Sequence, residues 1–330
     1  MSVLVTGGAG YIGSHMVWQL LDAGERVVVL DNLATGFDWA VAPEAPLVRG
    51  DIGDETLVRK LIADHGVEAI IHFAGSVVVP DSVADPLAYY LNNTVRSRAL
   101  IAAAVAGGVR QCIFSSTAAV YGTPQQTPVS EDVLLKPESP YGRSKLMTET
   151  MLADTAAAHD FRYVALRYFN VAGADPKGRT GQSTRGATHL IKVACETALG
   201  KRDSMSVYGT DYPTADGTCV RDYIHVSDLV AAHSEALKHL RQGGRSMVAN
   251  CGYGRGYSVL EVVEAVREVS GRTFPVVMTG RRPGDPSAIV ANPALIMSEF
   301  GWRPRYDDLR GIVASALAWE DALSRRNRRD

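Results

Sequence analysis

The chain has 330 residues, of which 46% are apolar and 21% are charged, and its formal net charge is −2. These values are typical of a folded globular protein, and they exclude the disordered, collagen-like and coiled-coil classes. Because nucleic acids and membrane surfaces favour proteins with a basic excess, the near-neutral charge predicts that neither is a partner.

The first half of the chain alternates short apolar runs with helical stretches. Residues 2–6 are a β-rich run that ends at Gly7 and Gly8, and residues 11–23 are predicted to form a helix. Further strands are predicted at 26–30, 46–49, 69–73, 111–115 and 163–168, with helices between them, for example at 54–65 and 86–106. Continuous apolar strands that alternate with helices indicate a parallel sheet covered on both faces. Right-handed crossovers then make it a Rossmann-like, doubly wound α/β fold.

The pattern changes beyond Ala172. Residues 173–186 are rich in glycine and polar residues and predict a loop, after which short strands at 205–208, 247–250 and 275–278 mix with helices. Ser258 and Glu261 form an S-x-x-E capping box, which we interpret as structural. We expect a first domain over residues 1–172 and a smaller C-terminal α/β domain over 173–330, beside the carboxyl ends of the strands. Segments around 220–240 are expected to pack back on the first domain.

Three features predict a cytoplasmic protein. The four cysteines form no CxxC pair, which argues against a disulfide framework and a metal site, so we expect reduced thiols and no metal. The N-terminal apolar run belongs to a strand rather than to a secretion signal. No apolar segment approaches the ~20 residues that cross a bilayer.

Three glycines lie between the first strand and the first helix. Gly7, Gly10 and Gly13 form G-x-x-G-x-x-G, and a Cβ would obstruct the sharp turn, the approach to a pyrophosphate and the packing of the helix on the sheet. The N-terminus of the helix then offers N–H groups and a partial positive charge to phosphates. In this strand–turn–helix context the motif predicts a dinucleotide site.

Two acidic residues follow the next strands. The carboxylate of Asp31 is placed to accept hydrogen bonds from the adenosine ribose and to repel a 2′-phosphate, which favours NAD over NADP. The alternative is a turn acid that caps the next loop. Asp51 either accepts from the adenine amino group or caps the helix that begins near Asp54, and the spacing supports both roles equally.

Tyr141 and Lys145 stand at i and i+4, so a helix places both on one face. A free tyrosine has a pKa of ~10, and a neighbouring ammonium group favours its phenolate form. Lowering that pKa towards ~7 requires ~4 kcal/mol, which is plausible with the positive charge of a nicotinamide nearby. Thr117 ends the preceding strand, where its hydroxyl is placed to meet the same substrate oxygen. We predict that these three residues are catalytic, the alternative being a surface helix pair.

The segment from Thr6 to His15, together with Tyr141-xxx-Lys145, resembles the extended short-chain dehydrogenase/reductase family. Four further segments resemble its UDP-galactose 4-epimerases, namely HFAG at 72–75, YFNVAG at 168–173, DYPT at 211–214 and DGTCVRDYIHV at 216–226. The stretch around Arg221 is the most specific, because the dehydrogenase fold in general does not share it. The resemblance covers nearly the whole chain.

The resemblance implies an NAD-dependent interconversion of UDP-galactose and UDP-glucose. Tyr141 would take the proton of the sugar 4-hydroxyl as hydride passes from C4 to NAD. Lys145 would hold the nicotinamide ribose and tune Tyr141, and Thr117 would hydrogen-bond the reacting oxygen. The 4-keto sugar would then turn and receive the hydride on its other face.

The resemblance also implies a contact set for each ligand. NAD would contact Gly7, Gly10, Tyr11, Ile12, Gly13, Asp31, Asn32, Thr35, Gly36, Asp51, Ile52, Phe73, Ala74, Gly75, Asn92, Tyr141, Lys145 and Phe169. The UDP-sugar would contact Thr117, Tyr141, Asn170, His189, Leu190, Tyr208, Arg221, Arg282 and Asp285. Arginines suit a diphosphate because they are cationic, multidentate donors, although any one of them is equally well explained as a surface ion pair. The family further implies that the first domain binds NAD, that the second mainly binds the UDP-sugar, and that a homodimer forms through helices around 86–106 and 141–159.

The chain departs from its relatives at three positions. Val77 stands where many relatives have a lysine near the cofactor, which leaves permanent retention of NAD open. His189 stands in place of an asparagine and either substitutes as a donor or only packs. Ile289 occupies a position whose size varies with the acceptance of N-acetyl sugars, and isoleucine leaves that choice open.

Other members of the fold class use the same first oxidation. A dehydratase needs an acid and a base directly after the threonine, whereas Thr117 is followed by Ala118 and Ala119. A decarboxylase, a reductase, or an epimerase of UDP-N-acetylhexosamines or UDP-pentoses stays possible. An NAD-binding sensor is expected to lose the Tyr141/Lys145 pair, which this chain keeps.

Overall fold

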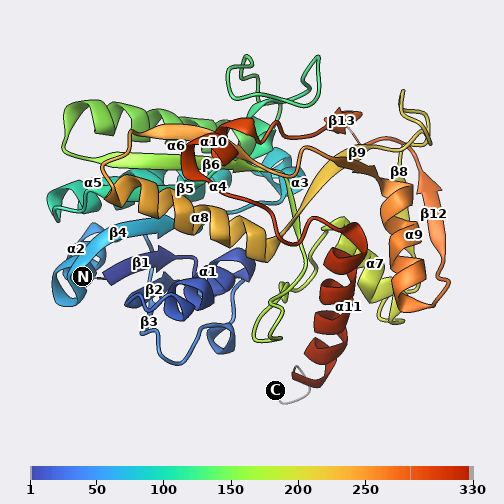
Figure 1. The fold of residues 1–330 in the computed structure, drawn as a ribbon, viewed down its shortest axis with the longest axis horizontal. Helices are drawn as coiled ribbons and strands as arrows, with labels where there is room; N and C mark the ends of the chain where they lie inside the picture. Colours follow the sequence, from blue (N-terminus) through green and yellow to red (C-terminus); the bar gives the residue numbers. More distant parts are fainter. Residues whose placement is uncertain (1, 283, 327–330) are drawn as a thin grey trace.

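The computed structural model describes residues 2–282 and 284–326. Its centre is a seven-stranded sheet with the order β10-β6-β5-β4-β1-β2-β3, and every neighbouring pair is parallel (Figure 1). The strands are β1 (Ser2–Thr6), β2 (Val27–Asp31), β3 (Leu47–Arg49), β4 (Val67–His72), β5 (Gln111–Ser115), β6 (Arg162–Tyr168) and β10 (Met247–Cys251). The predicted Rossmann-like α/β fold is confirmed.

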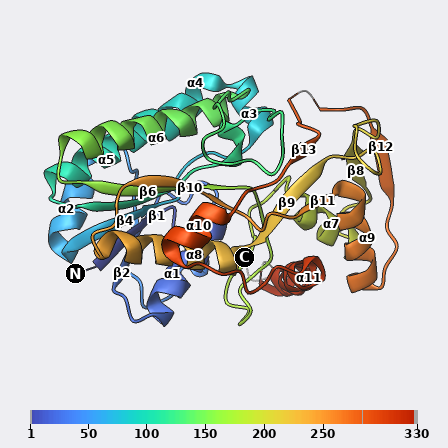
Figure 2. The ribbon, with the colours of Figure 1, turned by 45° about the horizontal axis from the view of Figure 1, so that its top comes forward.

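Helices cover both faces of this sheet, as Figure 2 shows. One face carries α1 (Tyr11–Asp22) and α8 (Val226–Arg241), and the other carries α2 (Glu55–His65), α5 (Arg96–Ala106) and α6 (Pro140–Ala158). Alternation along β1 explains the two layers, because Val3 and Val5 belong to the first core and Leu4 to the second. Strands buried on both sides are apolar throughout, which is the pattern seen in the sequence.

The predicted helix at 86–106 is present, but its middle turn is π-helical. Pro86–Tyr89 forms α4 and Arg96–Ala106 forms α5, while Tyr90–Val95 between them has π-helical hydrogen bonds. A further short helix, α3 (Val79–Ala84), precedes them. The periodicity of apolar residues does not distinguish a π-helical turn from an α-helical one.

The second half of the chain builds a smaller body at the carboxyl ends of the strands (Figure 1). In it β9 (Val220–His225) pairs with β7 (Asn170–Ala172), β11 (Gly256–Ser258) and β13 (Ala288–Ile289), and β8 (Met205–Tyr208) pairs with β12 (Val276–Thr279). Helices α7 (Leu190–Ala198), α9 (Val259–Ser270) and α11 (Leu309–Arg326) share one apolar core. The capping box of Ser258 and Glu261 is present at the start of α9.

Parts of the second half return to the large sheet. Helix α8 packs on α1 and under β5 and β6, and α10 (Ala294–Phe300) packs on α8 and β10. The strand β10, which the sequence analysis grouped with the smaller domain, instead extends the large sheet beside β6, where Ala249 and Cys251 are fully buried. The division of the chain at residue 172 stays a prediction.

Over the residues described, no helix is both long and apolar enough to cross a membrane. The same residues contain no group of three or more His, Cys, Asp or Glu side chains placed to hold a metal ion. All four cysteines are buried and free.

Candidate active site

The glycine loop is packed so tightly that side chains do not fit. Gly7 has φ +70°, and a Cβ on it would lie 2.6 Å from the backbone nitrogen of Ala74. A Cβ on Gly13 would lie 2.1 Å from the carbonyl oxygen of Gly7. Gly10 precedes α1 and supplies no capping side chain, so the first N–H groups of the helix face the loop without a side-chain partner at the cap.

Asp31 holds two loops together. Its buried carboxylate accepts hydrogen bonds from the N–H groups of Ala9, at 2.9 Å, and Leu33, at 2.8 Å. The alternative of a loop-capping acid is therefore present in the structure, and the contact with a ribose stays a prediction. Behind this loop, a Cβ on Gly36 would lie 2.7 Å from the backbone of Ala9, so the predicted Thr35-Gly36 segment lies directly against the glycine loop.

Asp51 is not the helix cap. Asp54 caps α2 by accepting from the N–H of Leu57 at 3.0 Å. Asp51 accepts from the N–H of Gly53 at 2.8 Å and lies 3.2 Å from Nε of Arg96. Asp54 therefore fills the capping role that the sequence left open for Asp51, and the contact of Asp51 with adenine stays a prediction.

The turn after β4 lies against an asparagine pair. Asn92 donates to Oγ of Ser76 at 2.9 Å. Asn93, which is fully buried, accepts from the N–H of Ser76 at 2.8 Å and donates to Oγ of Ser144 at 3.1 Å. A Cβ on Gly75 would lie 3.0 Å from Oδ1 of Asn93 and 3.6 Å from Nζ of Lys145. The sequence analysis named Asn92 and missed Asn93, since nothing in the local pattern tells the two apart.

Tyr141 and Lys145 lie on one face of α6, and both are buried. The ammonium group of Lys145 donates to the carbonyl oxygen of Ser115 at 2.9 Å and lies 4.9 Å from the ring centre of Phe114. Burial lowers the pKa of Lys145 to about 8. A charged lysine at neutral pH is therefore held in the interior at the end of β5.

Burial raises the pKa of Tyr141 to about 12, and the Thr117 hydroxyl opposes this shift. The sequence predicts that the lysine and a bound nicotinamide lower this pKa together; the protein side chains alone do not lower it, and the combined effect stays a prediction. Desolvation outweighs the charge effect because the ammonium group is directed to Ser115 instead of to the phenol. Lowering the Tyr141 pKa therefore requires the positive charge of a bound nicotinamide ring.

The predicted catalytic residues meet at the end of β5. Thr117 directly follows Ser115 and Ser116, is buried, and accepts from the N–H of Ala119 at 3.1 Å. Its hydroxyl reaches Tyr141, while the carbonyl of Ser115 two residues earlier holds Lys145. The end of one strand and one turn of α6 therefore position all three side chains.

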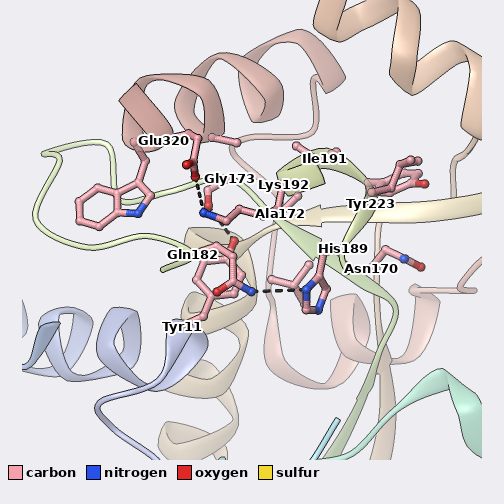
Figure 3. A pocket seen from close by; sticks show the side chains of 14 residues that line it. Tyr11, Asn170, Ala172, Gly173, Gln182, His189, Ile191, Lys192, Tyr223 and Glu320 are labelled. Carbon is pink, nitrogen blue, oxygen red and sulfur yellow. Dashed lines mark hydrogen bonds and ion pairs between the residues drawn. The ribbon is translucent and has the colours of Figure 1, made fainter. Parts of the chain in front are cut away.

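A pocket of about 460 Å³, part of it open to solvent, lies between the glycine loop and the smaller body (Figure 3). Four predicted ligand residues line it: Tyr11, Asn170, His189 and Leu190. Tyr11 donates to the carbonyl of Gly173 at 2.7 Å, which ties the glycine loop to the strand β7 region. The sequence analysis did not single out other lining residues, among them Gln182, Lys192, Tyr223, Trp319 and Glu320.

Nδ1 of His189 lies 3.4 Å from Nε2 of Gln182, and the side chain is exposed at the edge of the pocket (Figure 3). It precedes α7 and supplies no capping hydrogen bond. The imidazole thus lies at the pocket wall, where it is open to solvent.

The predicted diphosphate residues form a separate cluster. Arg282 donates from Nε to Asp285 at 2.9 Å, and its guanidinium carbon lies 4.6 Å from the ring centre of Tyr208. Nη2 of Arg221, on β9, lies 3.9 Å from the same carboxylate. These four side chains lie together, and two cations share one anion. Their contact with a UDP-sugar stays a prediction. Pro283 of the same loop lies outside the described residues.

Two of the departures from the relatives have clear positions. The side chain of Ile289 packs in a buried cluster with Ala118 and Val120, next to Thr117, and Phe169 packs against the same cluster. Val77 is 47% exposed after the turn that follows β4.

A loop of the second half lies against α1. Arg179 donates to Asp22 at 2.9 Å and its guanidinium lies 4.4 Å from the ring centre of Trp18. The hydroxyls of Ser14 and Thr180 are hydrogen-bonded at 2.7 Å. The small cavity that this loop closes over the start of α1 is lined by Ala9, Gly10, Tyr11, Ser14, Thr35, Phe37, Ala40, Gly181, Ser183 and Thr184.

Sequence reasoning also missed a buried ion pair beside the catalytic residues. Glu149, one turn after Lys145 on α6, forms two hydrogen bonds with Arg167 of β6. Nothing in the local pattern marks either residue, because they are 18 positions apart on different elements.

Comparison with known proteins gives a consistent result. A family model described as "NAD dependent epimerase/dehydratase family" matches residues 3–252. The chain is 57% identical over 321 residues to the UDP-glucose 4-epimerase of Azospirillum brasilense, covering 97% of this chain and 92% of that protein. The solved structure of UDP-glucose 4-epimerase from Brucella ovis in complex with NAD has a TM-score of 0.93 and 45% identity, covering 96% of this chain and 97% of that one. The enzyme from Bifidobacterium longum in complex with NAD+ and UDP has a TM-score of 0.93 and 37% identity, covering 98% of both chains.

Proposed function

The chain belongs to the NAD-dependent epimerase/dehydratase family, and from this premise we propose that it is an NAD-dependent isomerase that interconverts UDP-galactose and UDP-glucose. One observation carries the proposal: Thr117, Tyr141 and Lys145 meet at the carboxyl end of β5, in a chain 57% identical to a UDP-glucose 4-epimerase. Relatives with the same fold are solved with NAD and with UDP.

The residues present fit NAD. The glycine loop forms a cradle that a Cβ at Gly7 or Gly13 would fill, and the N–H groups at the start of α1 suit a pyrophosphate. Asp31 and Asn32 lie at the end of β2 for the adenosine ribose, and Phe73, Ala74 and Gly75 continue the site across the switch between β1 and β4. When bound, NAD accepts a hydride from the sugar and returns it.

The side chains move one proton during the reaction. Oη of Tyr141 takes the proton of the sugar 4-hydroxyl and gives it back after the 4-keto sugar has turned over. Burial alone keeps this phenol neutral, so reaching a pKa near 7 from about 12 requires roughly 7 kcal/mol from neighbouring positive charge. Lys145 remains mostly protonated at neutral pH but directs its ammonium group to the Ser115 carbonyl, so a bound nicotinamide would supply that charge. Thr117 holds the reacting oxygen.

The substrate site follows from the cationic cluster. Arg221 and Arg282 bind the diphosphate, with Asp285 and the Tyr208 ring holding the guanidinium groups in place. Asn170, His189 and Leu190 line the pocket beside it. The second half of the chain thus mainly binds the UDP-sugar, and residues 1–172 mainly bind NAD.

Exposed apolar side chains support a homodimer. Leu87, Leu91 and Val95 are 77%, 50% and 54% exposed on α4 and the π-helical segment, and Met147 on the adjacent α6 is 45% exposed. A contiguous apolar face of this kind marks an interaction site. We expect Leu91→Glu to convert a dimer into a monomer on gel filtration with light scattering, and a wild-type monomer at micromolar concentration would refute the dimer.

The buried free thiols support a cytoplasmic location.

The activity is tested by incubating the purified protein with UDP-galactose without added NAD. We expect UDP-glucose as product, and we expect Tyr141→Phe to abolish the reaction while bound NAD is retained. Stoichiometric formation of NADH without UDP-glucose would identify a dehydrogenase instead.

A further inference from the structure

A second set of charges is buried one turn behind Lys145. Glu149 follows it by four residues on α6, so the two side chains lie on the same face of the helix. The Glu149 carboxylate accepts from Arg167 twice, from Nε at 3.0 Å and from Nη2 at 2.7 Å. The two side chains are only 5% and 4% exposed. The pair is a bidentate, desolvated ion pair, which is geometrically specific.

The same carboxylate is bonded to the strand end that carries the catalytic contacts. Oγ of Ser116 donates to Oε1 of Glu149, and the N–H of Ser116 donates to the carbonyl of Leu166 on β6 at 2.9 Å. Ser116 stands between Ser115, whose carbonyl holds Lys145, and Thr117, whose hydroxyl reaches Tyr141. Glu149 therefore fixes the backbone from which both contacts are made.

Arg167 is held from its other side. Its Nη1 donates to Oη of Tyr121 at 3.1 Å and to the carbonyl of Glu131 at 3.4 Å. Tyr121 in turn donates to Oδ1 of Asn250 on β10 at 2.7 Å. The network thus extends from α6 through β6 to the edge strand, and a satisfied buried network of this kind holds its members rigidly.

We propose that Glu149 and Arg167 are positioning residues for the reaction, whose ion pair fixes the Ser115 carbonyl and the Thr117 hydroxyl and sets the electrostatic field at Lys145. This inference rests on the proposed function. The two residues act through Lys145 and Thr117, and the proposal assigns them no contact with the reacting atoms.

The charge balance around Lys145 gives the proposal a direction. The ionisable groups around it come from three elements: His72 on β4, Tyr141 and Glu149 on α6, and Tyr168 on β6, with Arg167 of β6 behind Glu149. Burial keeps three of these neutral, because it lowers the pKa of His72 to about 3 and raises the pKa values of both tyrosines. Glu149 and Arg167 are therefore the charged members of the group. Burial lowers the pKa of Lys145, and the Glu149 carboxylate opposes that shift.

Substitutions of the two residues have opposite expected effects on the pH profile. Glu149→Gln keeps the shape and removes the negative charge, so the pKa of Lys145 falls. Because activity needs the lysine protonated, the alkaline limb of kcat then moves to lower pH. Arg167→Gln removes the cation that neutralises Glu149, so the carboxylate raises the pKa of Lys145 further and the alkaline limb of kcat moves to higher pH. We expect both variants to lower kcat on the order of 10-fold to 100-fold, since a misplacement near 1 Å costs ~100-fold. KM for UDP-galactose and the NAD content are expected to stay unchanged.

Asp228→Asn is the matched control. Asp228 is another buried carboxylate, which accepts from Oη of Tyr253 at 2.6 Å and from the N–H of Arg305 at 3.0 Å. Its replacement is expected to lower the melting temperature and to leave the alkaline limb of kcat in place. If Glu149→Gln and Arg167→Gln behave in the same way, with only the melting temperature changed, the pair is purely structural and the proposal is overturned.

A smaller variant keeps the proposal testable if loss of the ion pair prevents folding. Ser116→Ala removes one hydroxyl and leaves Glu149 and Arg167 paired. We expect a lower kcat with unchanged KM, and an unchanged kcat would contradict the positioning role. The two proposals fail separately: a wild-type protein without epimerase activity refutes the proposed function, whereas an active wild type with unaffected variants refutes only this inference.

Discussion

Gly13→Ala is expected to weaken NAD binding, because it adds a methyl group where α1 passes over the glycine loop. The new Cβ would lie 2.1 Å from the carbonyl oxygen of Gly7 and 2.8 Å from Cα of Gly8. Both neighbours are backbone atoms, so relief requires the loop or the helix to move by roughly 1 Å, and overpacking of this kind costs ~1–3 kcal/mol. If that strain falls on the NAD-binding geometry, the dissociation constant rises about 5-fold to 150-fold at 1.4 kcal/mol per decade.

Gly311→Ala is the matched control for this substitution. Gly311 is the third residue of α11, as Gly13 is of α1, and a Cβ there would meet only the Asp308 side chain, with Oδ2 at 3.4 Å and Cβ at 3.9 Å. Alanine is better than glycine in a helix by ~1 kcal/mol, so this variant is expected to be as stable as the wild type or more so. The assay is NAD retained per subunit after gel filtration, together with titration of NAD into stripped protein. Wild-type NAD content and affinity in Gly13→Ala would refute the reasoning.

Three further predictions concern substrate, loop and lysine. Arg221→Met is expected to raise KM for UDP-galactose by about 10-fold to 150-fold, which corresponds to the loss of ~1.5–3 kcal/mol for hydrogen bonds to a charged group. The NAD content is expected to stay unchanged. An unaltered KM would exclude a role of Arg221 in binding the diphosphate. Asp22→Asn breaks the ion pair with Arg179, so release of NAD in a chase experiment is expected to be up to about 5-fold faster, the limit for an exposed pair worth ~1 kcal/mol. This difference is expected to vanish in 1 M salt, and equal release rates at low salt would contradict it. Lys145→Met is expected to abolish turnover and to stabilise the protein at pH 7 by on the order of 3 kcal/mol. The stabilisation is expected because burial lowers the pKa of the lysine from 10.5 to about 8, so that its charge is unfavourable in the folded protein. The unfolded chain binds the lysine proton more tightly than the folded protein does, so the contribution of Lys145 to the free energy of unfolding rises between pH 8 and 10.5. Denaturation of the wild type and of Lys145→Met over this pH range measures the rise. If the wild type shows no such rise relative to the variant, the lowered pKa of Lys145 is refuted.

The parts of the fold predicted from the sequence are those that local patterns encode. Each apolar strand is predicted by its own run of residues, and the spacing from Gly7 to Gly13 predicts the turn between the first strand and the first helix. Tyr141 and Lys145 lie on one face because an α-helix has 3.6 residues per turn. The order of strands is not local. In the sequence, residues 247–250 predict one more short strand, and the place of this strand beside β6 depends on how α8 packs under the sheet.

The electrostatics of the site were the least predictable part. Spacing indicated that Lys145 lies near Tyr141, but the pKa of the phenol depends on burial, which only the packed structure supplies. Glu149 and Arg167 were missed for a related reason, because an ion pair between a helix and a strand leaves no periodic trace in the sequence. The sequence also did not decide whether Asp51 caps α2, because Asp51 and Asp54 both precede the helix. In the structure the cap is Asp54.

The central claim is that the hydrogen at C4 of the sugar leaves and returns within one active site, with the proton of the hydroxyl handled by Tyr141. Conversion of UDP-galactose in D₂O, followed by NMR of the UDP-glucose formed, tests this directly. We predict that C4 of the product carries protium, because a hydride carried by a bound nicotinamide does not exchange with water. Deuterium at C4 would contradict the account.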